Sequence, residues 1–378
     1  MSVCEKFAAY AKTASAEAAD IVRTMCKIPA PSHHEELRAE YCRKWFTDNG
    51  FANVFVDGAL NVIAHINDNG SNDITIVMAH TDTVFPDTEP MPFVEKDGFM
   101  HSPGVVDDTA NLAVLMACSR YYLANCDPGN KCVLFIANSC EEGLGNLKGT
   151  RQIMKDYGKR VKEFISFDSA CMNRYVNQAV GSHRYKVTVR TEGGHSFGAF
   201  GNRNAIHVLS SMICSLYTVK VPQVGESRTT YNVGGISGGT SVNTIAQDAE
   251  MLYEYRSDNF ECLEKMRVMF NNTVEMYRSM GVTVEVELLG ERPCGVEVDS
   301  ASLQKLQNRY LSALKDALDM EGIARSGSTD CNIPLSMGVP AICFGVCRGA
   351  GCHTREEKLE VASLYDGCKL ALQLFCNL

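Results

Sequence analysis

Two apolar runs of the sequence are each followed closely by side chains that can bind a metal ion or move a proton. His80 and Asp82 follow the first run, Glu141 and Glu142 follow the second, and a lone His353 lies far downstream. Histidine and carboxylate ligands without thiolate suit zinc or a similar divalent ion, and one carboxylate can bridge two ions about 3.5–4 Å apart. Of two adjacent glutamates, one can bind metal while its neighbour takes the proton of a bound water as general base. The pattern indicates a hydrolase that uses two metal ions.

These side chains fall at the expected ends of sheet strands. In an open α/β sheet, residues just beyond the carboxyl ends of the strands converge on one crevice. His80, Asp82, Glu141 and Glu142 take such positions, and Asp168 does so after a further apolar run. We therefore expect all five side chains to share one site.

A loop between these segments supplies two more carboxylates. Asp107 and Asp108 lie directly before a long apolar helix expected over residues 109–124. Backbone N–H groups at the start of a helix can hold a carboxylate in place, so a ligand there would be well oriented. Either aspartate is a candidate for the carboxylate that bridges two ions.

The rest of the larger domain is expected to form an α/β sheet with helices on its faces. Ser32 and Glu35 form a capping-box pattern, which predicts a helix over residues 36–49 that closes at Gly50. Short runs of β-branched and aromatic residues predict strands over 52–56, 60–66, 74–78, 133–137, 164–167 and 341–344.

The middle of the chain predicts a separate, inserted domain. Its expected elements are a strand over 184–191, a helix over 204–217, strands over 229–235 and 249–256, a helix over 262–280 and a strand over 282–288. The order β-α-β-β-α-β is that of a ferredoxin-like domain. Because His353 comes after these elements, they interrupt the larger domain. We expect a discontinuous catalytic, metal-binding domain over residues 1–180 and 293–378, with the inserted domain over residues 181–292.

Composition narrows the class of protein. The 378 residues contain no apolar run near the roughly 20 residues that a membrane span needs, and the first 30 residues lack the pattern of a secretory signal. A net charge of -9 without basic clusters argues against nucleic acid or an anionic membrane as partner. Seventeen scattered cysteines are expected to be reduced thiols. We expect a cytoplasmic protein that acts on a small molecule.

Several of these segments together resemble the co-catalytic zinc metallopeptidases and amidohydrolases that include peptidase T, glutamate carboxypeptidase, acetylornithine deacetylase and the aminoacylases. The matching segments are Ala-His-Thr-Asp-Thr-Val at residues 79–84, the Asp-Asp loop at 107–108, Glu-Glu-Gly-Leu-Gly at 141–145 and Gly-Cys-His-Thr-Arg-Glu-Glu at 351–357. The resemblance covers nearly the whole chain and is specific because the motifs agree in order and spacing. It implies the α/β/α catalytic domain of a zinc peptidase with a ferredoxin-like lid and dimerisation domain.

The resemblance also implies a role for each candidate ligand. One metal ion would be held by His80, Asp107 and Asp168, and the other by Asp107, Glu142 and His353. The position within the motif favours Asp107 over Asp108 as the bridging ligand. The ions are expected to be zinc, with manganese or cobalt as alternatives.

Catalytic and substrate-binding residues follow from the same comparison. Asp82 would orient the ring of His80 and Glu141 would act as general base. His195, in the motif Gly-Gly-His-Ser, would stabilise the oxyanion, often in the active site of a partner subunit. Asn243 and Arg256 would bind a carboxylate or the backbone of the substrate, because the planar fork of arginine suits a carboxylate.

The turn Gly327-Ser328-Thr329-Asp330 is equally consistent with substrate contact and with a purely structural role.

The sequence thus predicts a dinuclear zinc hydrolase, most like peptidase T, that cleaves an amide bond of a di- or tripeptide and forms a homodimer. An N-acyl amino acid deacylase or a carboxypeptidase would use the same metal chemistry on a different amide. A binding protein that has kept the fold without turnover is a further alternative, although the presence of Glu141 argues against it.

Overall fold

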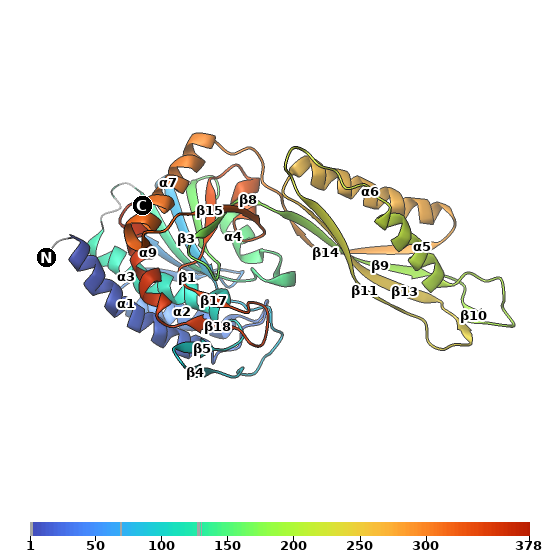
Figure 1. Cartoon of the computed structure of the whole chain (residues 1–378), viewed down its shortest axis with the longest axis horizontal. Coiled ribbons are helices and arrows are strands. Elements are labelled where there is room, and N and C mark those ends of the chain that lie inside the picture. Colours follow the sequence, from blue (N-terminus) through green and yellow to red (C-terminus); the bar gives the residue numbers. More distant parts are fainter. Residues whose placement is uncertain (1–2, 69, 127–128, 130) are drawn as a thin grey trace. The chain divides into compact units, whose positions relative to one another are not determined.

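An eight-stranded mixed sheet forms the centre of the larger unit (Figure 1). Its strand order is β1-β2-β6-β3-β7-β16-β8-β15, and the four central strands β6, β3, β7 and β16 are parallel. The strands are β1 (Asn53–Val56), β2 (Val62–Ile66), β3 (Ile74–His80), β6 (Cys132–Asn138), β7 (Val161–Phe167), β8 (Arg174–Ala179), β15 (Ile323–Gly327) and β16 (Ala341–Phe344). Both β3 and β6 are buried along their whole length, as the unbroken apolar runs predict.

This computed structural model describes residues 3–68, 70–126, 129 and 131–378. Within it the chain divides into two compact units, which are Met1–Ala179 with Val296–Leu378, and Val180–Gly295. The predicted boundaries lay after residues 180 and 292, whereas the structure divides the chain after residues 179 and 295.

Helices cover both faces of the large sheet. Successive side chains of β3 alternate between the two faces, so that Val77 and Ala79 enter one apolar core while Ile76 and Met78 enter the other. The first core includes α1 (Val3–Met25), α2 (Glu36–Asp48), α3 (Asn111–Asn125), α7 (Ser300–Leu318) and α9 (Ser363–Phe375), and the second includes α4 (Lys148–Tyr157) and α8 (Asn332–Ser336). None of the described helices combines the length and apolar character needed to cross a bilayer.

A small four-stranded sheet holds the segment that contains His353. Its order is β17-β18-β5-β4, and it joins two parts of the chain that are far apart in sequence. The strands are β4 (Val94–Lys96), β5 (Phe99–His101), β17 (Gly349–Ala350) and β18 (Lys358–Glu360). Because His353 lies in the loop between β17 and β18, this sheet brings it to the segment that follows β5.

The second unit is an antiparallel sheet of order β11-β13-β9-β14 with two helices packed in its core. Its elements are β9 (Gly181–Arg190), β10 (Gly194–His195), α5 (Ala205–Tyr217), β11 (Thr229–Gly238), β12 (Thr244–Ile245), β13 (Asp248–Ser257), α6 (Phe260–Ser279) and β14 (Thr283–Arg292). Apart from the short pair β10 and β12, the order is the predicted β-α-β-β-α-β. Met266, Phe270 and Tyr277 of α6 are buried, as their helical spacing indicates.

One local prediction in the larger unit is wrong, and one predicted helix begins two residues later than expected. The capping box does not form, because Glu35 takes the cap position of α2 without a capping side-chain hydrogen bond, and the Ser32 hydroxyl instead donates to Asp82, 2.6 Å away. The long helix also starts differently. A π-helical turn, η1 (Val105–Ala110), precedes α3, and Asp107 within it has non-helical backbone angles. Both departures occur where the chain positions acidic side chains.

Candidate metal centre

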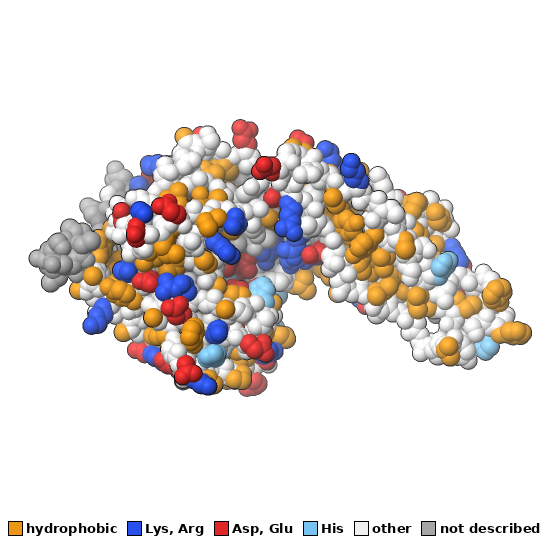
Figure 2. All heavy atoms as spheres, viewed as in Figure 1, with side chains coloured by type: hydrophobic (Ala, Val, Ile, Leu, Met, Phe, Trp, Pro, Cys, Tyr) orange, Lys and Arg blue, Asp and Glu red, His pale blue; other side chains and the backbone are white. Residues whose placement is uncertain are grey.

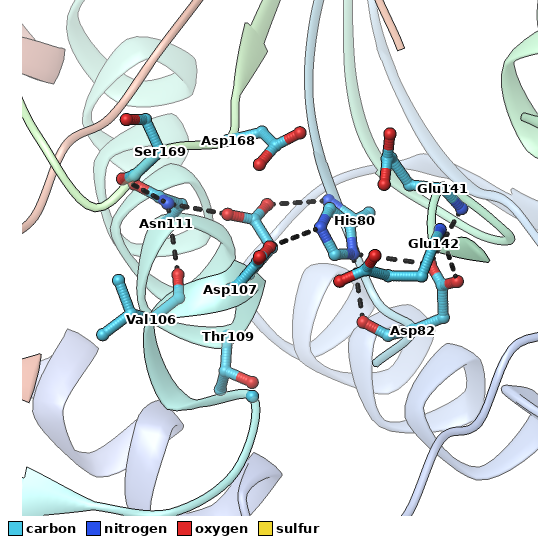
Figure 3. A network of polar contacts seen from close by, with 12 residues as sticks. His80, Asp82, Val106, Asp107, Thr109, Asn111, Glu141, Glu142, Asp168 and Ser169 are labelled. Atoms are coloured by element: carbon cyan, nitrogen blue, oxygen red, sulfur yellow. Dashed lines mark hydrogen bonds and ion pairs between the residues drawn. The ribbon is translucent and has the colours of Figure 1, made fainter. Parts of the chain in front are cut away.

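His80, the last residue of β3, lies at the centre of a polar cluster and is 1% exposed. Its Nε2 atom is 3.1 Å from Oδ1 of Asp107, and its Nδ1 atom is 3.0 Å from the backbone oxygen of Asp82 and 3.4 Å from a carboxylate oxygen of the same residue. Figure 3 shows His80 between the two aspartates. Hydrogen bonding at Nδ1 fixes the ring so that Nε2 faces the acidic side chains.

Asp82 links the ends of two strands. Its carboxylate oxygens accept hydrogen bonds from the backbone N–H groups of Glu141 and Glu142, each at 3.0 Å, and from Ser32. These two glutamates lie shortly after the end of β6. Asp82 therefore holds them beside His80 (Figure 3). Burial alone would raise the pKa of Asp82, but hydrogen bonding and charge attraction from His80 lower it. The carboxylate therefore stays ionised in the protein interior.

Asp107 and Asp108 are joined by a cis peptide bond, and their side chains have different surroundings. Asp107 contacts both predicted histidine ligands, with Oδ1 3.1 Å from His80 and Oδ2 3.1 Å from His353. Asp108 is fully buried and accepts hydrogen bonds from the backbone N–H of His80 at 2.9 Å and from Asn111 at 2.7 Å. The two oxygens of Asp107 thus each contact a different histidine. Those of Asp108 accept hydrogen bonds from the backbone of His80 and from the side chain of Asn111.

The five predicted metal ligands come together in two overlapping groups. One contains His80, Asp107 and Asp168, with Asp108 beside them, and the other contains Asp107, Glu142 and His353. In each group one ligand atom per residue lies within 4.8 Å of those of the others. Histidine nitrogens and carboxylate oxygens at this spacing fit zinc and other divalent cations. Asp107 belongs to both groups, as a bridging ligand must.

The charges in this cluster explain why a cation would fit it. Burial, together with the negative charge of Asp107, raises the pKa of Asp168 to about 7. Hydrogen bonds to the carboxylates of Asp107 and Glu142 raise the pKa of His353 to about 11. The crowding of carboxylates therefore favours bound protons in this cluster, either on the Asp168 carboxyl group or on the His353 ring. Divalent cations bound to the same atoms would neutralise this charge.

Glu357 holds the loop of Asp107 in place and was not among the predicted site residues. Its buried carboxylate accepts hydrogen bonds from the backbone N–H groups of Gly104 (2.8 Å), Val106 (2.7 Å) and Asp107 (2.9 Å). It follows His353 by four residues in the motif that the sequence already singled out. Position in that motif was the only available signal, because the three N–H groups lie about 250 residues away in the chain.

Two further buried polar residues fix the surroundings of the site. The side chain of Asn111 donates to the carbonyl of Ser169 at 3.1 Å and accepts from the N–H of Val346 at 2.8 Å, which connects the start of α3 with two loops. Asp330 accepts hydrogen bonds from Asn138 at 2.6 Å and from Thr150. For Asp330, these contacts favour the structural interpretation of the turn at residues 327–330.

In the second unit, the structure brings His195 and Asn243 into neighbouring segments. His195 is exposed on β10, which pairs with β12, and the N–H of Ser196 donates to the backbone oxygen of Asn243 at 2.9 Å. The Nδ1 atom of His195 accepts from the N–H groups of Phe197 and Gly198, each at 3.3 Å. An acceptor at Nδ1 places the proton of the neutral ring on Nε2, which is then a donor.

Arg256, on β13, is paired with an acidic residue of its own strand. Its guanidinium forms two hydrogen bonds of 3.0 Å with the carboxylate of Glu254. This is the two-bond geometry that was expected with a substrate carboxylate. Contact between Arg256 and a substrate would require this pair to open.

Comparison with known proteins gives the same class of protein as the fold and the site. An α/β unit with histidine and carboxylate groups at its strand ends, interrupted by a ferredoxin-like unit, is the architecture of metal-dependent peptidases and amidohydrolases. The chain belongs to Peptidase family M20/M25/M40, whose profile matches residues 76–377. The predicted family and fold class are therefore confirmed.

Individual relatives are distant but match over nearly their whole length. A succinyl-diaminopimelate desuccinylase of Corynebacterium glutamicum is 25% identical over 356 residues, which cover 92% of each chain. The aminopeptidase PepT of Bacillus cereus has a similar structure, with a TM-score of 0.72 and 22% identity over 96% of this chain and 98% of that one. The dipeptidase Dug1p of Saccharomyces cerevisiae gives a TM-score of 0.78 at 16% identity, covering 100% and 99% of the two chains.

Proposed function

We propose that the protein is a dinuclear zinc-dependent hydrolase that cleaves an amide bond of a di- or tripeptide. The observation that carries the proposal is the position of Asp107. One of its oxygens contacts His80, in the first group of candidate metal ligands, and the other contacts His353, in the second group. Membership of a peptidase family supports hydrolysis of an amide. The PepT and Dug1p structures, described as an aminopeptidase and a dipeptidase, support a short peptide as substrate.

The proposed ligands are His80, Asp107 and Asp168 for one ion, and Asp107, Glu142 and His353 for the other. When bound, two zinc ions, or manganese or cobalt in their place, would polarise the scissile carbonyl and acidify a water molecule.

Glu141 is the proposed general base. Its side chain belongs to a compact group with His80 and Glu142, and it is 5% exposed. It would take the proton from the attacking water and deliver it to the leaving amine. Asp82 would keep both glutamates and the ring of His80 in place, since it hydrogen-bonds to all three residues.

The second unit would contribute to substrate binding. His195, with its Nε2–H as donor, would stabilise the oxyanion that forms during attack on the carbonyl. Asn243 would bind the substrate nearby. Arg256 would bind a substrate carboxylate in exchange for its pair with Glu254.

The decisive experiment compares wild-type protein with Glu141→Ala. Wild-type protein supplied with zinc, manganese or cobalt should hydrolyse members of a panel of dipeptides and tripeptides. Glu141→Ala should bind the same amount of metal and lose about 10²–10⁴-fold in kcat. Glu40→Ala, at an exposed position of α2, is the control and should keep full activity. Full activity of Glu141→Ala would refute the mechanism.

N-acyl amino acid deacylation is the second candidate function. The C. glutamicum relative named succinyl-diaminopimelate desuccinylase supports this alternative, because its substrate is an N-acyl amine. The panel should therefore include N-acetyl and N-succinyl amino acids. A higher kcat/KM for these compounds than for every peptide would favour the deacylase. Metal binding without hydrolysis of any compound would favour a binding protein.

We further propose a cytoplasmic homodimer that associates through the second unit. Large exposed apolar side chains of this unit include Phe197, Phe200, Val242, Leu252 and Leu288. Hydrophobic side chains are exposed along this unit, including the end that carries β10 (Figure 2). Surfaces of this kind favour association. The cysteines that the structure describes are all free thiols, which supports a reducing compartment.

A further inference from the structure

A cavity lies beside Glu142 in the larger unit. Its volume is about 530 Å³, and residues 31–34, 83–86, 88 and 142–145 contribute to its walls. This volume falls within the ~300–1,000 Å³ of typical ligand pockets. Because Glu142 is a proposed metal ligand, a group bound in the cavity would lie next to the reacting bond.

The walls of the cavity are mainly apolar. Pro31, Val84, Phe85, Pro86 and Leu144 line it, and no lysine or arginine is among the described residues that line it. Leu144 is 57% exposed and Val84 is 39% exposed, so part of the apolar wall is in contact with water. A bound group that covered them would remove this apolar surface from water.

Neighbouring charges and backbone contacts keep the walls in place. Arg355 stacks on Phe85, with its guanidinium 4.8 Å from the ring centroid, and its charge is paired with Asp87 at 2.7 and 3.0 Å. His33 contacts the carbonyl oxygen of Leu144 at 3.4 Å. The arginine next to the cavity is thus already neutralised, and the loop that carries Leu144 is held to the opposite segment.

We infer that this cavity is the subsite for an apolar side chain of the substrate residue next to the scissile amide bond. The inference rests on the proposed function. An apolar side chain gains from leaving water here, whereas a carboxylate would lose hydration against the apolar side chains of the wall, where the described lining residues offer it no lysine or arginine. An aspartate side chain or a succinyl group is therefore disfavoured in this cavity. The subsite selects for hydrophobic peptides at this position.

The first test compares substrates that differ in one side chain of similar size. Wild-type protein loaded with zinc is assayed with Leu-Ala and Asp-Ala, and with Ala-Leu and Ala-Asp, so that either side of the bond can occupy the cavity. We expect kcat/KM for leucine to exceed that for aspartate at least about tenfold in one series. Equal values in both series would overturn the inference and leave the hydrolase proposal intact. Absence of hydrolysis of every peptide and N-acyl compound would refute the proposed function itself.

The second test changes the wall. Leu144→Arg should lower kcat/KM for the preferred leucine peptide at least tenfold and narrow or reverse the preference over aspartate, because the new cation can pair with a carboxylate. Leu37→Arg, at a leucine of α2 that is 65% exposed, is the matched control and should leave both values unchanged. An unchanged leucine-to-aspartate ratio in a folded, metal-loaded Leu144→Arg protein would overturn the inference. If this variant does not fold, Val84→Lys provides the same test on another wall, with the same two outcomes.

Discussion

Neighbouring residues of the same type have different surroundings throughout the metal centre. Asp107 faces two histidines, while Asp108 accepts hydrogen bonds from the backbone of His80 and from Asn111. One carboxylate faces the two histidines, and the other is fully buried. Their proposed roles, bridging two ions and holding the end of β3, follow from these contacts.

The contrast predicts different metal contents for two single variants. Asp107→Asn should bind at most one ion per chain, because the carboxylate of Asp107 is a proposed ligand of both ions and the substitution removes its charge. Asp108→Asn should keep two ions, because it changes a carboxylate that mainly accepts hydrogen bonds. Elemental analysis after equilibration with zinc measures both. Loss of metal from Asp108→Asn with two ions retained by Asp107→Asn would assign the bridge to Asp108 instead.

Glu357 provides a second prediction at this scale. Glu357→Gln replaces an acceptor of three backbone N–H groups by an amide with a single acceptor oxygen, so donors meet a donor. We expect a loss of about 1–3 kcal/mol in the free energy of unfolding and weaker metal binding. Thermal melts and zinc titrations test it. Glu356→Gln, one residue earlier and exposed, is the control and should match wild type. Wild-type stability and affinity in Glu357→Gln would show that the loop needs no such anchor.

The ten site residues were predicted from motifs in the sequence, whereas the residues that hold them in place were not predicted. His80, Glu141 and His353 lie in motifs whose residue types and order together indicate metal chemistry. Glu357 and Asn111 act through hydrogen bonds to segments that are near only after folding. A single sequence contains no local pattern for such pairs. Arg256 shows the converse, because its partner Glu254 is only two residues away in the sequence.

At the scale of elements, short apolar strands were predicted well and irregular starts were not. The predicted strand at residues 341–344 has the observed bounds of β16, since its composition is unambiguous. The helix α1 was not predicted, because its buried face consists of small residues such as Ala11, Ala14 and Ala18 among charged ones. The start of α2 at residue 36 was predicted correctly, but its cap was not, because Ser32 bonds to Asp82 rather than to its own helix.

Packing of α9 gives a prediction at this scale. A Cβ atom on Gly367 would lie 1.6 Å from the carbonyl oxygen of Val346, so alanine cannot be accommodated without moving the helix. Helix propensity alone would make Gly367→Ala stabilising by up to ~1 kcal/mol. We expect instead a loss of about 1–3 kcal/mol or more in the free energy of unfolding, measured by denaturant titration. Gly58→Ala, where no heavy atom lies within 4 Å, should be close to neutral. A stabilised Gly367→Ala would contradict such a close contact between α9 and Val346.

For the whole molecule, the question is whether two chains build one site. Light scattering should give twice the 41.5 kDa of one chain. If His195 acts in the active site of a partner, mixing His195→Ala with Glu141→Ala should restore activity that neither variant has alone. Each mixed dimer would then contain one site with both an intact base and an intact oxyanion donor. A mixture as inactive as its parents, despite proven exchange of subunits, would place His195 in its own chain's site, and a fully active monomer would exclude the dimer mechanism.

The interruption of the larger unit by the smaller one also sets an order of events during synthesis. Residues 180–295 form a continuous unit and leave the ribosome complete, whereas the larger unit must wait for its last segment, Val296–Leu378. That segment supplies His353, the anchor Glu357 and the helix α9, which covers one face of the large sheet. We therefore expect a growing chain to carry a complete insert and an unfinished sheet whose apolar face is not yet covered by α9. The proposed second ligand group is complete only once His353 has been synthesised, so we expect full loading with metal to follow the synthesis of this segment.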